Sequence, residues 1–406
     1  ATTVAETNGI KQTAQDLNNA ITQLKHSIAD KDQTKAYGNF TNADTEKQTA
    51  YNNAVTQAQQ LIDGSPNVVV TPSEITDALN HVNQTKDELN GNTNLANAKQ
   101  TVTNAIDQLP NLNQAQRDEY NKQITQATAV PDVNAIQTAA EKLNEAMTNL
   151  KQGIANKDDI LAGEDYHDAD QDKQAAFNDA ISAAQDLLNQ TASPTMDPTQ
   201  VTNALTKVQE TTQALNGNEK LETEKQNAKA TITTLDHLNS AQQHALTDQI
   251  DQAPDIEHVN QIKQVAENLN NAMTALSNGL QDKTEILGNI NYTDADQDKK
   301  DAYNAAIAHA ENILDKANGG NVPQTEVEQA LQQLTDAKQA LNGNNNVQNA
   351  KNEAIQAIEN ASELNQAQKE ALKQQVDLAT TVDKVNGIKQ TTQDLNQAMA
   401  DLKQGI

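Results

Sequence analysis

The chain has 406 residues, a formal net charge of −27 at pH 7, neither cysteine nor tryptophan, and a hydrophobic content of only 36%. Strong negative charge repels phosphate backbones and anionic membrane surfaces, which argues against a nucleic-acid partner, and the absence of cysteine excludes disulfides and thiolate chemistry. Because much of the small apolar fraction is alanine, the composition favours many small helical bundles over one large core.

The first predicted element is a helix over residues 4–28, which is a near copy of the last one, residues 382–406. The residues before it do not form a signal peptide. The sequence contains no stretch of about 18 apolar residues, so it does not predict direct membrane insertion. Neither end has the atypical sequence of a capping repeat, so we expect the array to continue on both sides.

A repeat of 126 residues organises the chain without insertion or deletion. Two markers keep this step: the motif Leu-Asn-Gly, which ends at Gly91, Gly217 and Gly343, and the acidic residues Asp44, Asp170 and Asp296.

The first half of each repeat is clearest between Tyr292 and Gly343. Apolar residues from Ala302 to Leu314 and from Val327 to Leu341 recur at i, i+3, i+4 and i+7, which predicts two amphipathic helices. A loop rich in Gly, Asn and Pro separates them, and Asn342-Gly343 is expected to stop or bend the second.

The second half predicts three helices, over about 347–358, 366–378 and 385–402 in the last repeat. Before the middle helix, an Asn followed three residues later by Gln forms a capping box. The pairs are Asn113 with Gln116, Asn239 with Gln242, and Asn365 with Gln368.

The first half has only two helices of its own, so the third helix of its bundle must come from the preceding segment. That segment carries Met147, Leu150 and Ile154 and continues to Ile160-Leu161. It has no proline, and its one glycine, Gly153, is tolerable inside a helix at about 1 kcal/mol. One long helix is therefore expected to belong to two successive bundles.

We therefore predict an all-α fold, an elongated string of small three-helix bundles in which successive bundles are joined by shared long helices. The predicted bundles alternate between the two kinds. They cover residues 1–91 (preceded by the last helix of an upstream bundle at about 4–28), 92–152, 153–217, 218–278, 279–343 and 344–406.

Both halves resemble known modules. The first resembles the FIVAR module through Phe40, Asn42-Ala43-Asp44, Lys47, Ala50-Tyr51, Ala54-Val55 and Ala58. The second resembles the GA module, named for albumin-binding three-helix domains, through Leu221, Ala228-Lys229, Ile232, Leu238-Asn239, Gln242, Ile250, Val259-Asn260, Ile262, Ala266, Leu269-Asn270, Met273 and Leu276. Their alternation at this period is similar to the family of giant staphylococcal extracellular matrix-binding proteins, and it covers essentially the whole chain.

This resemblance implies an extracellular, cell-wall-associated bacterial adhesin with a role in attachment, biofilm and virulence, and with host fibronectin as the expected partner. The chain would act as a monomeric, extended stalk that binds through many weak contacts. Three alternatives stay open: a purely mechanical spacer or envelope-integrity element, serum-albumin binding through the GA-like bundles, and a cytoplasmic spectrin-like scaffold.

Histidines do not recur at the repeat step, as they would in a metal or catalytic site built by the repeat. Shifted by one repeat, His81 corresponds to Lys207 and His167 to Thr293. We expect surface histidines without a metal at His26, His81, His167, His237, His244, His258 and His309.

Alternating acids resemble a calcium loop at Asp168, Asp170 and Asp172 and again at Asp294, Asp296 and Asp298. However, the sixth and twelfth positions, which should be Gly and Glu, are Lys173 and Asp179. The favoured interpretation is a helix start with the capping pairs Thr41 and Asp44, and Thr293 and Asp296.

Six aromatic residues occupy two recurrent positions, and Tyr and Phe replace each other at both, so no hydroxyl is required. A place in the bundle core is the favoured interpretation over an exposed binding anchor. They are Phe40, Tyr166 and Tyr292, and then Tyr51, Phe177 and Tyr303.

No phosphate-binding glycine loop, nucleophile elbow or HExxH motif occurs. The sequence therefore predicts no catalytic residue, no cofactor and no enzyme activity. It does not single out any residue as a ligand contact.

Overall fold

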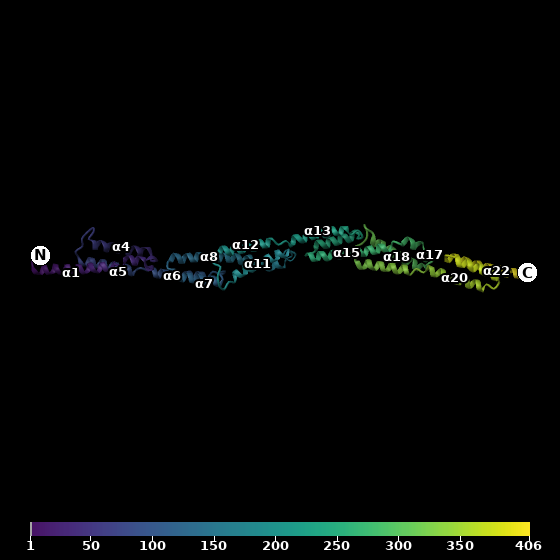
Figure 1. The fold of residues 1–406 in the computed structure, drawn as a ribbon, viewed down its shortest axis with the longest axis horizontal. Coiled ribbons are helices and arrows are strands. Elements are labelled where there is room, and N and C mark those ends of the chain that lie inside the picture. Colours follow the sequence, from purple (N-terminus) through teal and green to yellow (C-terminus); the bar gives the residue numbers. More distant parts are fainter. Residues whose placement is uncertain (1) are drawn as a thin grey trace. The chain divides into compact units, whose positions relative to one another are not determined.

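The computed structural model describes residues 2–406, which form α-helices and connecting turns and contain no β-strand. The predicted all-α class is confirmed. The chain divides into two compact units: the chain up to Tyr166 together with Asp170–Leu215, and His167–Ala169 together with Asn216–Ile406. Figure 1 follows the helices of both units in chain order.

The helices up to the end of the first unit are mostly long, with two pairs of short connecting helices between them. They are α1 (Val4–Ser27), α2 (Lys31–Ala36), α3 (Gly38–Thr41), α4 (Thr45–Asp63), α5 (Pro72–Asp87), α6 (Gly91–Asp107), α7 (Gln114–Gln126), α8 (Val130–Gly153), α9 (Lys157–Ala162), α10 (Glu164–His167), α11 (Gln171–Leu188) and α12 (Pro198–Gln213).

The second unit repeats this order. Its helices are α13 (Gly217–Thr234), α14 (Ser240–Gln252), α15 (Ile256–Gly279), α16 (Lys283–Gly288), α17 (Ile290–Thr293), α18 (Gln297–Leu314), α19 (Gln324–Gln339), α20 (Gly343–Asn360), α21 (Gln366–Leu378) and α22 (Val382–Gly405).

The FIVAR-like bundle packs two helices of its own against a helix from the preceding segment. In the first copy, α1, α4 and α5 contact one another around a core that includes Leu24, Tyr51 and Ile75, all fully buried. Pro72 occupies the first turn of α5, where its missing N–H costs no intrahelical hydrogen bond.

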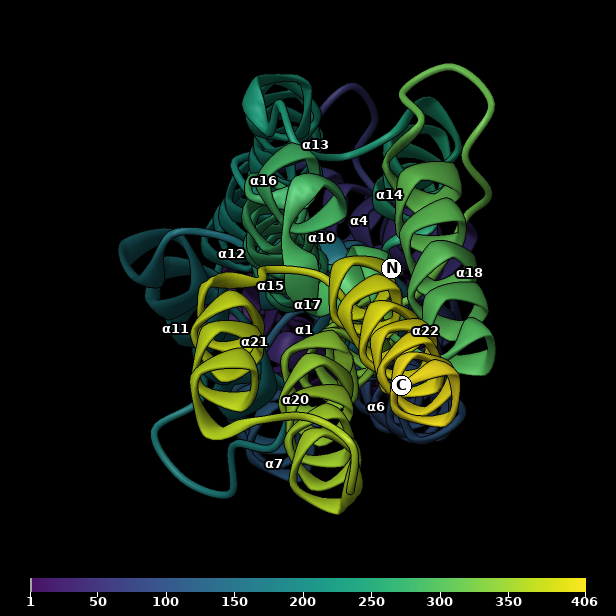
Figure 2. The ribbon, with the colours of Figure 1, turned by 90° about the vertical axis from the view of Figure 1, so that its right-hand side faces the viewer.

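The GA-like bundle has three helices of its own. Helices α20, α21 and α22 contact one another pairwise and lie together at the carboxyl end of the chain (Figure 2). The middle helix begins with the predicted capping box in all three copies, because Asn113, Asn239 and Asn365 each accept the N–H of the Gln three residues later, whose side chain bonds back.

Helices α8 and α15 each belong to two bundles, which confirms the predicted shared helices. Helix α8 contacts α6 and α7 of the GA-like bundle and also α11 and α12 of the next FIVAR-like bundle. In the same way, α15 contacts α13 and α14 and then α18 and α19.

The shared helix is shorter than predicted. It ends at Gly153, the chain turns at residues 154–156, and Ile160-Leu161 belong to the short helix α9. A Cβ atom on Gly153 would lie 2.2 Å from Cδ1 of Leu205 in α12. The glycine thus leaves room for the Leu205 side chain, although Ser27 occupies the equivalent position in the first copy.

Candidate functional surfaces at the joints between bundles

Each joint from a GA-like bundle into the next FIVAR-like bundle is bridged by the side chains of the capping box. Gln242 is fully buried, its Nε2 donates to the carbonyl of Val322 at 2.9 Å, and its Oε1 accepts the N–H of Asn239 at 3.0 Å. Asn239 Nδ2 donates to the carbonyls of Ile313 at 3.1 Å and Gly320 at 2.9 Å. We call this pair and its onward bonds the capping-box latch.

The first repeat contains the same latch. Gln116 is fully buried and donates to the carbonyl of Thr195 at 2.8 Å, and Asn113 donates to the carbonyl of Leu187 at 2.9 Å. A buried polar group that loses its partner costs about 1–3 kcal/mol, so these bonds hold the loop of the following bundle against the middle helix of the preceding one.

In the third copy, the capping box starts its helix but, within the described residues, makes no bond to a following bundle. Asn365 and Gln368 still form the box, with bonds of 3.0 and 2.8 Å, but Asn365 is exposed and Gln368 is half-buried. No described FIVAR-like bundle follows them. The box therefore forms without the onward bonds, and the burial of its side chains comes from the next bundle.

The hydrophobic core also crosses this kind of joint. One continuous cluster runs from Leu221 and Ile232 of the GA-like bundle through Leu276 of α15 to Ile313 and Val327 of the FIVAR-like bundle. Val322, the latch acceptor, packs against it as well. Burial of shared apolar surface therefore couples these two bundles in addition to the latch.

The opposite joint, from a FIVAR-like bundle into a GA-like bundle, is polar. The carboxylate of Asp44 accepts hydrogen bonds from Asn90 Nδ2 at 2.8 Å and Asn94 Nδ2 at 2.9 Å, and its backbone N–H donates to Asn90 Oδ1 at 3.1 Å. The apolar clusters on either side of the corresponding third-repeat joint share no residue. Hydrogen bonds, not a common core, connect the bundles here.

The third repeat forms the same network. Asp296 accepts from Asn342 Nδ2 at 2.8 Å and from Asn346 Nδ2 at 2.9 Å. Hydrogen bonds from Asn342 and then Asn346 hold the pKa of the Asp296 carboxyl below its ordinary value, and those from Asn90 and Asn94 do the same for the pKa of Asp44.

This arrangement corrects the predicted capping pairs. Asp44 and Asp296 do precede α4 and α18 as N-cap residues, but neither side chain makes a capping hydrogen bond within its helix, and Thr41 and Thr293 end the short helices α3 and α17. The carboxylates instead bond to Asn side chains 46 and 50 residues further along the chain.

The glycine of the Leu-Asn-Gly motif allows this joint to close. A Cβ atom on Gly91 would lie 2.5 Å from the carbonyl oxygens of Gly38 and Asn39, and one on Gly343 would lie 2.2 Å from that of Ile290. Both glycines are buried at the first position of their helices. Only a residue without a side chain lets the backbones approach so closely.

A surface groove forms in phase at three places along the chain. The grooves have volumes of about 820, 670 and 660 Å³. Equivalent positions line all three: Asn42, Asp168 and Asp294; Ala43, Ala169 and Ala295; Asn94, Lys220 and Asn346; and Val130, Ile256 and Val382.

One groove differs from the others in its hydrogen bonding. Asn42 Oδ1 accepts the backbone N–H of Val130 at 2.9 Å, and Asp168 Oδ2 accepts that of Ile256 at 2.9 Å. The equivalent Asp294 has a buried Oδ2 with no hydrogen-bond partner in the described structure. A buried acceptor beside the third groove is therefore unsatisfied.

Sequence comparison assigns both halves of the repeat. A FIVAR domain model matches residues 20–90, 146–216 and 272–342, and a GA module model matches residues 1–20, 92–146, 218–272 and 344–398. The chain belongs to the FIVAR domain and GA module families.

Named relatives align with almost the whole chain. The chain is 68% identical over all 406 residues to the extracellular matrix-binding protein EbhA of Staphylococcus aureus strain Newman, of which it spans 12%. Over 391 residues, 96% of its length, it is 69% identical to the extracellular matrix-binding protein ebh of strain MW2, of which it spans 4%. Among solved structures, the crystal structure of EbhA (756–1003 domain) from Staphylococcus aureus has 40% identity and a TM-score of 0.58, covering 61% of this chain and 98% of that one.

The histidines lie on the surface of the FIVAR domains and GA modules. Six of the seven side chains are exposed and His237 is half-buried. Within residues 2–406, no three His, Asp or Glu side chains come together as a set that could ligate a metal ion. The same residues include no helix with the length and apolar character needed to span a bilayer.

The aromatic residues pair inside each FIVAR domain, across the turn between two helices. Phe40 and Tyr51 meet edge to face with ring centres 6.1 Å apart, and the other two pairs repeat this at 5.8 and 6.0 Å. Tyr51, Phe177 and Tyr303 are buried, whereas their partners are half-buried and cover them. The core position is confirmed, although the two aromatics lie on separate helices.

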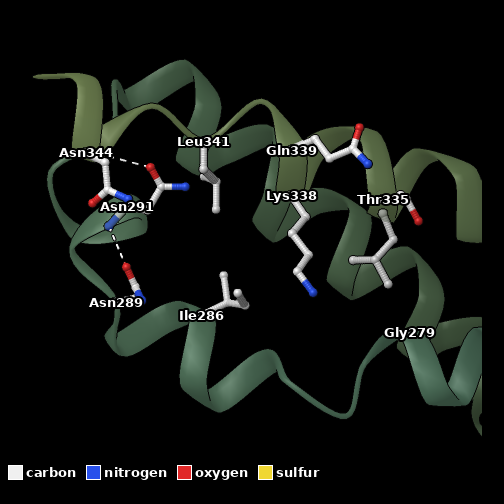
Figure 3. Close-up of a pocket in the computed structure, with 10 residues that line it drawn as sticks. Gly279, Ile286, Asn289, Asn291, Thr335, Lys338, Gln339, Leu341 and Asn344 are labelled. Atoms are coloured by element: carbon white, nitrogen blue, oxygen red, sulfur yellow. Dashed lines mark hydrogen bonds between the residues drawn. The ribbon is translucent and has the colours of Figure 1, made fainter.

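The third FIVAR domain also contains a pocket of about 490 Å³ between α16, α17 and the end of α19 (Figure 3). Ile286, Asn289 and Lys338 line it. Lys338 forms an ion pair with Asp282. Asn289 corresponds to Tyr37 and Gly163 in the other repeats, so this part of the lining does not recur.

The identity of one residue in the capping box could have predicted the latch, whereas the spacing of the box predicts only a helix cap. Gln116, Gln242 and Gln368 are identical in all three GA modules, although their capping role requires only Glu or Gln. A neutral amide is needed because the same side chain must also donate to a carbonyl of the next FIVAR domain.

Proposed function

We propose that this chain is a repeat segment of a bacterial surface adhesin that binds host extracellular matrix through several weak, equivalent contacts. Its role is binding and extension, not catalysis. The observation that carries the proposal is the phased recurrence of the same joint surfaces along one chain, because several equivalent weak sites give avidity without any single strong site.

The relatives support this proposal, since they are named for extracellular matrix binding. The chain spans a small part of each of them. We propose fibronectin as the matrix partner, with serum albumin as a second candidate ligand of the GA modules, and we place the segment outside the cell on the bacterial surface.

A second function, that of a mechanical spacer, is favoured by the GA-to-FIVAR joints. The continuous core from Leu221 to Val327 and the buried Gln242 resist separation of the two modules. A spacer needs such joints, whether or not its surface has a ligand.

Biolayer interferometry at physiological salt tests the proposal, with fibronectin and serum albumin immobilised on separate sensors and the whole 406-residue chain in solution. Saturable binding to fibronectin supports the adhesin. Binding to albumin alone assigns the ligand to the GA modules. Binding to neither, with an unchanged helical circular dichroism spectrum, leaves the spacer as the function.

A further inference from the structure

The copies of the repeat can be compared with one another like the sequences of an alignment. An exposed position is free to diverge between copies unless a contact or a function constrains it. Around the start of the last GA helix, exposed residues have diverged: position 131 is Pro, then Glu257 and Asp383, and position 135 is Ala, then Gln261 and Gly387. Between them, one exposed position has not changed. It is asparagine in all four copies: Asn8, Asn134, Asn260 and Asn386.

No structural role explains this asparagine. In the described part of the chain, none of the four side chains takes part in a hydrogen bond, whereas several other unchanged asparagines of the GA module do. Asn144, for example, accepts the N–H of Asn111 at 2.9 Å, and Asn270 accepts that of His237 at 3.0 Å. A conserved exposed polar residue without an intramolecular partner indicates an intermolecular one.

The asparagine lies at the recurring groove. Asn260 and Asn386 line the second and third grooves, and Asn134 is one helical turn after Val130, which lines the first. Each groove is complete only where a FIVAR domain runs into a GA module, because its walls come from both. Asn8 belongs to the same register, but the described chain has no FIVAR domain before it.

The chemistry of the walls indicates what fits there. All three grooves contain a buried alanine and a half-buried Val or Ile, and each is lined by more carboxylates than lysines, including Asp44 and Glu46 in the first and Asp296 and Asp383 in the third. A carboxamide carries N–H donors beside a carbonyl acceptor, so it can pair with the C=O and N–H of a peptide group. The buried, unpartnered Oδ2 of Asp294 adds an acceptor for a cationic or N–H donor.

We propose that the three grooves are the matrix-contacting surface, and that each takes an extended, basic polypeptide segment whose backbone is bound by Asn134, Asn260 or Asn386. This inference rests on the proposed function and names the surface that performs it. Charge complementarity selects a basic segment and excludes an anionic one. The amide supplies backbone recognition without strict sequence specificity.

The test uses the full chain with Asn134→Ala, Asn260→Ala and Asn386→Ala combined, and immobilised fibronectin as the probe. Three weak sites act together, so the triple variant is expected to lose at least about tenfold in apparent affinity, and each single variant roughly two- to threefold. The thermal midpoint should stay within about 1 °C, because no intramolecular bond is removed.

The matched control combines Gln23→Ala with Asn149→Ala. Gln23 and Asn149 are exposed, lie away from the groove, and occupy equivalent positions in two copies of the last GA helix. In a third copy the equivalent residue is already an alanine, Ala275. The control should bind like the unmodified chain. If the triple variant also binds like it, the inference is wrong while the adhesin stands.

Two further outcomes separate the alternatives. Loss of binding after enzymatic deglycosylation of fibronectin would assign the groove to carbohydrate and overturn the polypeptide segment. If the unmodified chain binds neither fibronectin nor a decellularised fibroblast matrix, the proposed function fails, and the inference fails with it.

Discussion

The side-chain amide of Gln242 donates to the backbone carbonyl of Val322 at 2.9 Å, across 80 residues of sequence and from one module into the next. The same carboxamide accepts the N–H of Asn239 and so completes a helix cap. A single buried side chain therefore both starts a helix and fixes the position of a neighbouring module.

Replacing Gln242 with alanine removes the cap bond and the bond to Val322 and leaves a cavity beside Met273. We expect a loss of roughly 2–4 kcal/mol in local stability, measured by native-state hydrogen exchange in α14 and in the loop before α19.

Gln368→Ala is the matched control for this substitution, because Gln368 forms the same box without an onward bond. It should cost about 1 kcal/mol, the usual value of a cap. Equal losses at the two positions would show that the bond across the joint contributes nothing.

Introducing a hydroxyl at Phe40 should stabilise the first FIVAR domain. In the third domain, the Tyr292 hydroxyl donates to Asn304 Oδ1 at 3.1 Å, whereas Asn52, the equivalent of Asn304, has a buried Oδ1 without a partner beside Phe40. Phe40→Tyr supplies the missing donor and should raise the free energy of unfolding by about 1 kcal/mol, as measured by hydrogen exchange in α4.

The reverse substitution is the control. Tyr292→Phe should destabilise the third FIVAR domain by a similar amount, since it leaves Asn304 in the situation of Asn52. An unchanged or lower stability of Phe40→Tyr would contradict the pairing.

Features set by neighbours in sequence were predictable, and features set by distant contacts were not. The capping boxes at Asn113, Asn239 and Asn365 depend on residues three positions apart, and all three form. The carboxylate of Asp44 bonds to Asn90, which lies 46 residues away. The local sequence pattern predicts a helix cap instead, and the carboxylate does not form one.

The end of the shared helix at Gly153 was not predicted either. Helix propensity allows glycine inside a helix at about 1 kcal/mol, which favoured continuation to Leu161. The chain instead turns at residues 154–156, and no proline or other helix-breaking residue in that segment indicates the turn. The candidate groove could not be predicted from local sequence patterns, because its walls come from two different modules.

The glycine of the Leu-Asn-Gly motif gives a steric prediction. Gly343→Ala places a methyl group 2.2 Å from the Ile290 carbonyl oxygen, so the backbones must separate. We expect a loss of about 1–3 kcal/mol, typical of overpacking, together with faster hydrogen exchange at the start of α20.

Gly387→Ala provides the comparison within the same GA module. Gly387 lies inside α22 with no atom within 4 Å of an added Cβ. The change should stabilise the helix by roughly 0.5–1 kcal/mol. A stabilising effect at both glycines would refute the steric requirement at the joint.

The FIVAR-to-GA joints should weaken in acid. Hydrogen bonds, first from Asn342 and then from Asn346, lower the folded-state pKa of Asp296, so its stabilising contribution is present above the ordinary pKa of 3.8 and is lost as the pH falls through the lowered value. Asp44 behaves in the same way through Asn90.

Thermal melts of the unmodified chain and of Asp44→Asn with Asp296→Asn, recorded by circular dichroism between pH 7 and 2.5, test this sign. The unmodified chain should melt at the higher temperature at neutral pH, and the difference should shrink below about pH 3.8. A difference that does not change with pH would rule out the ionised carboxylates as its source.

The fixed 126-residue step has a genetic consequence. Gln116 and Thr195 are separated by less than one period, and so are Gly91 and Asn39. Recombination between neighbouring copies of the repeat, aligned in register, adds or deletes one whole period wherever the crossover falls. Every joint in the product again pairs a glutamine side chain with a backbone carbonyl, and a glycine with the turn that it packs against. Gene length can therefore vary between lineages without any new interface having to evolve.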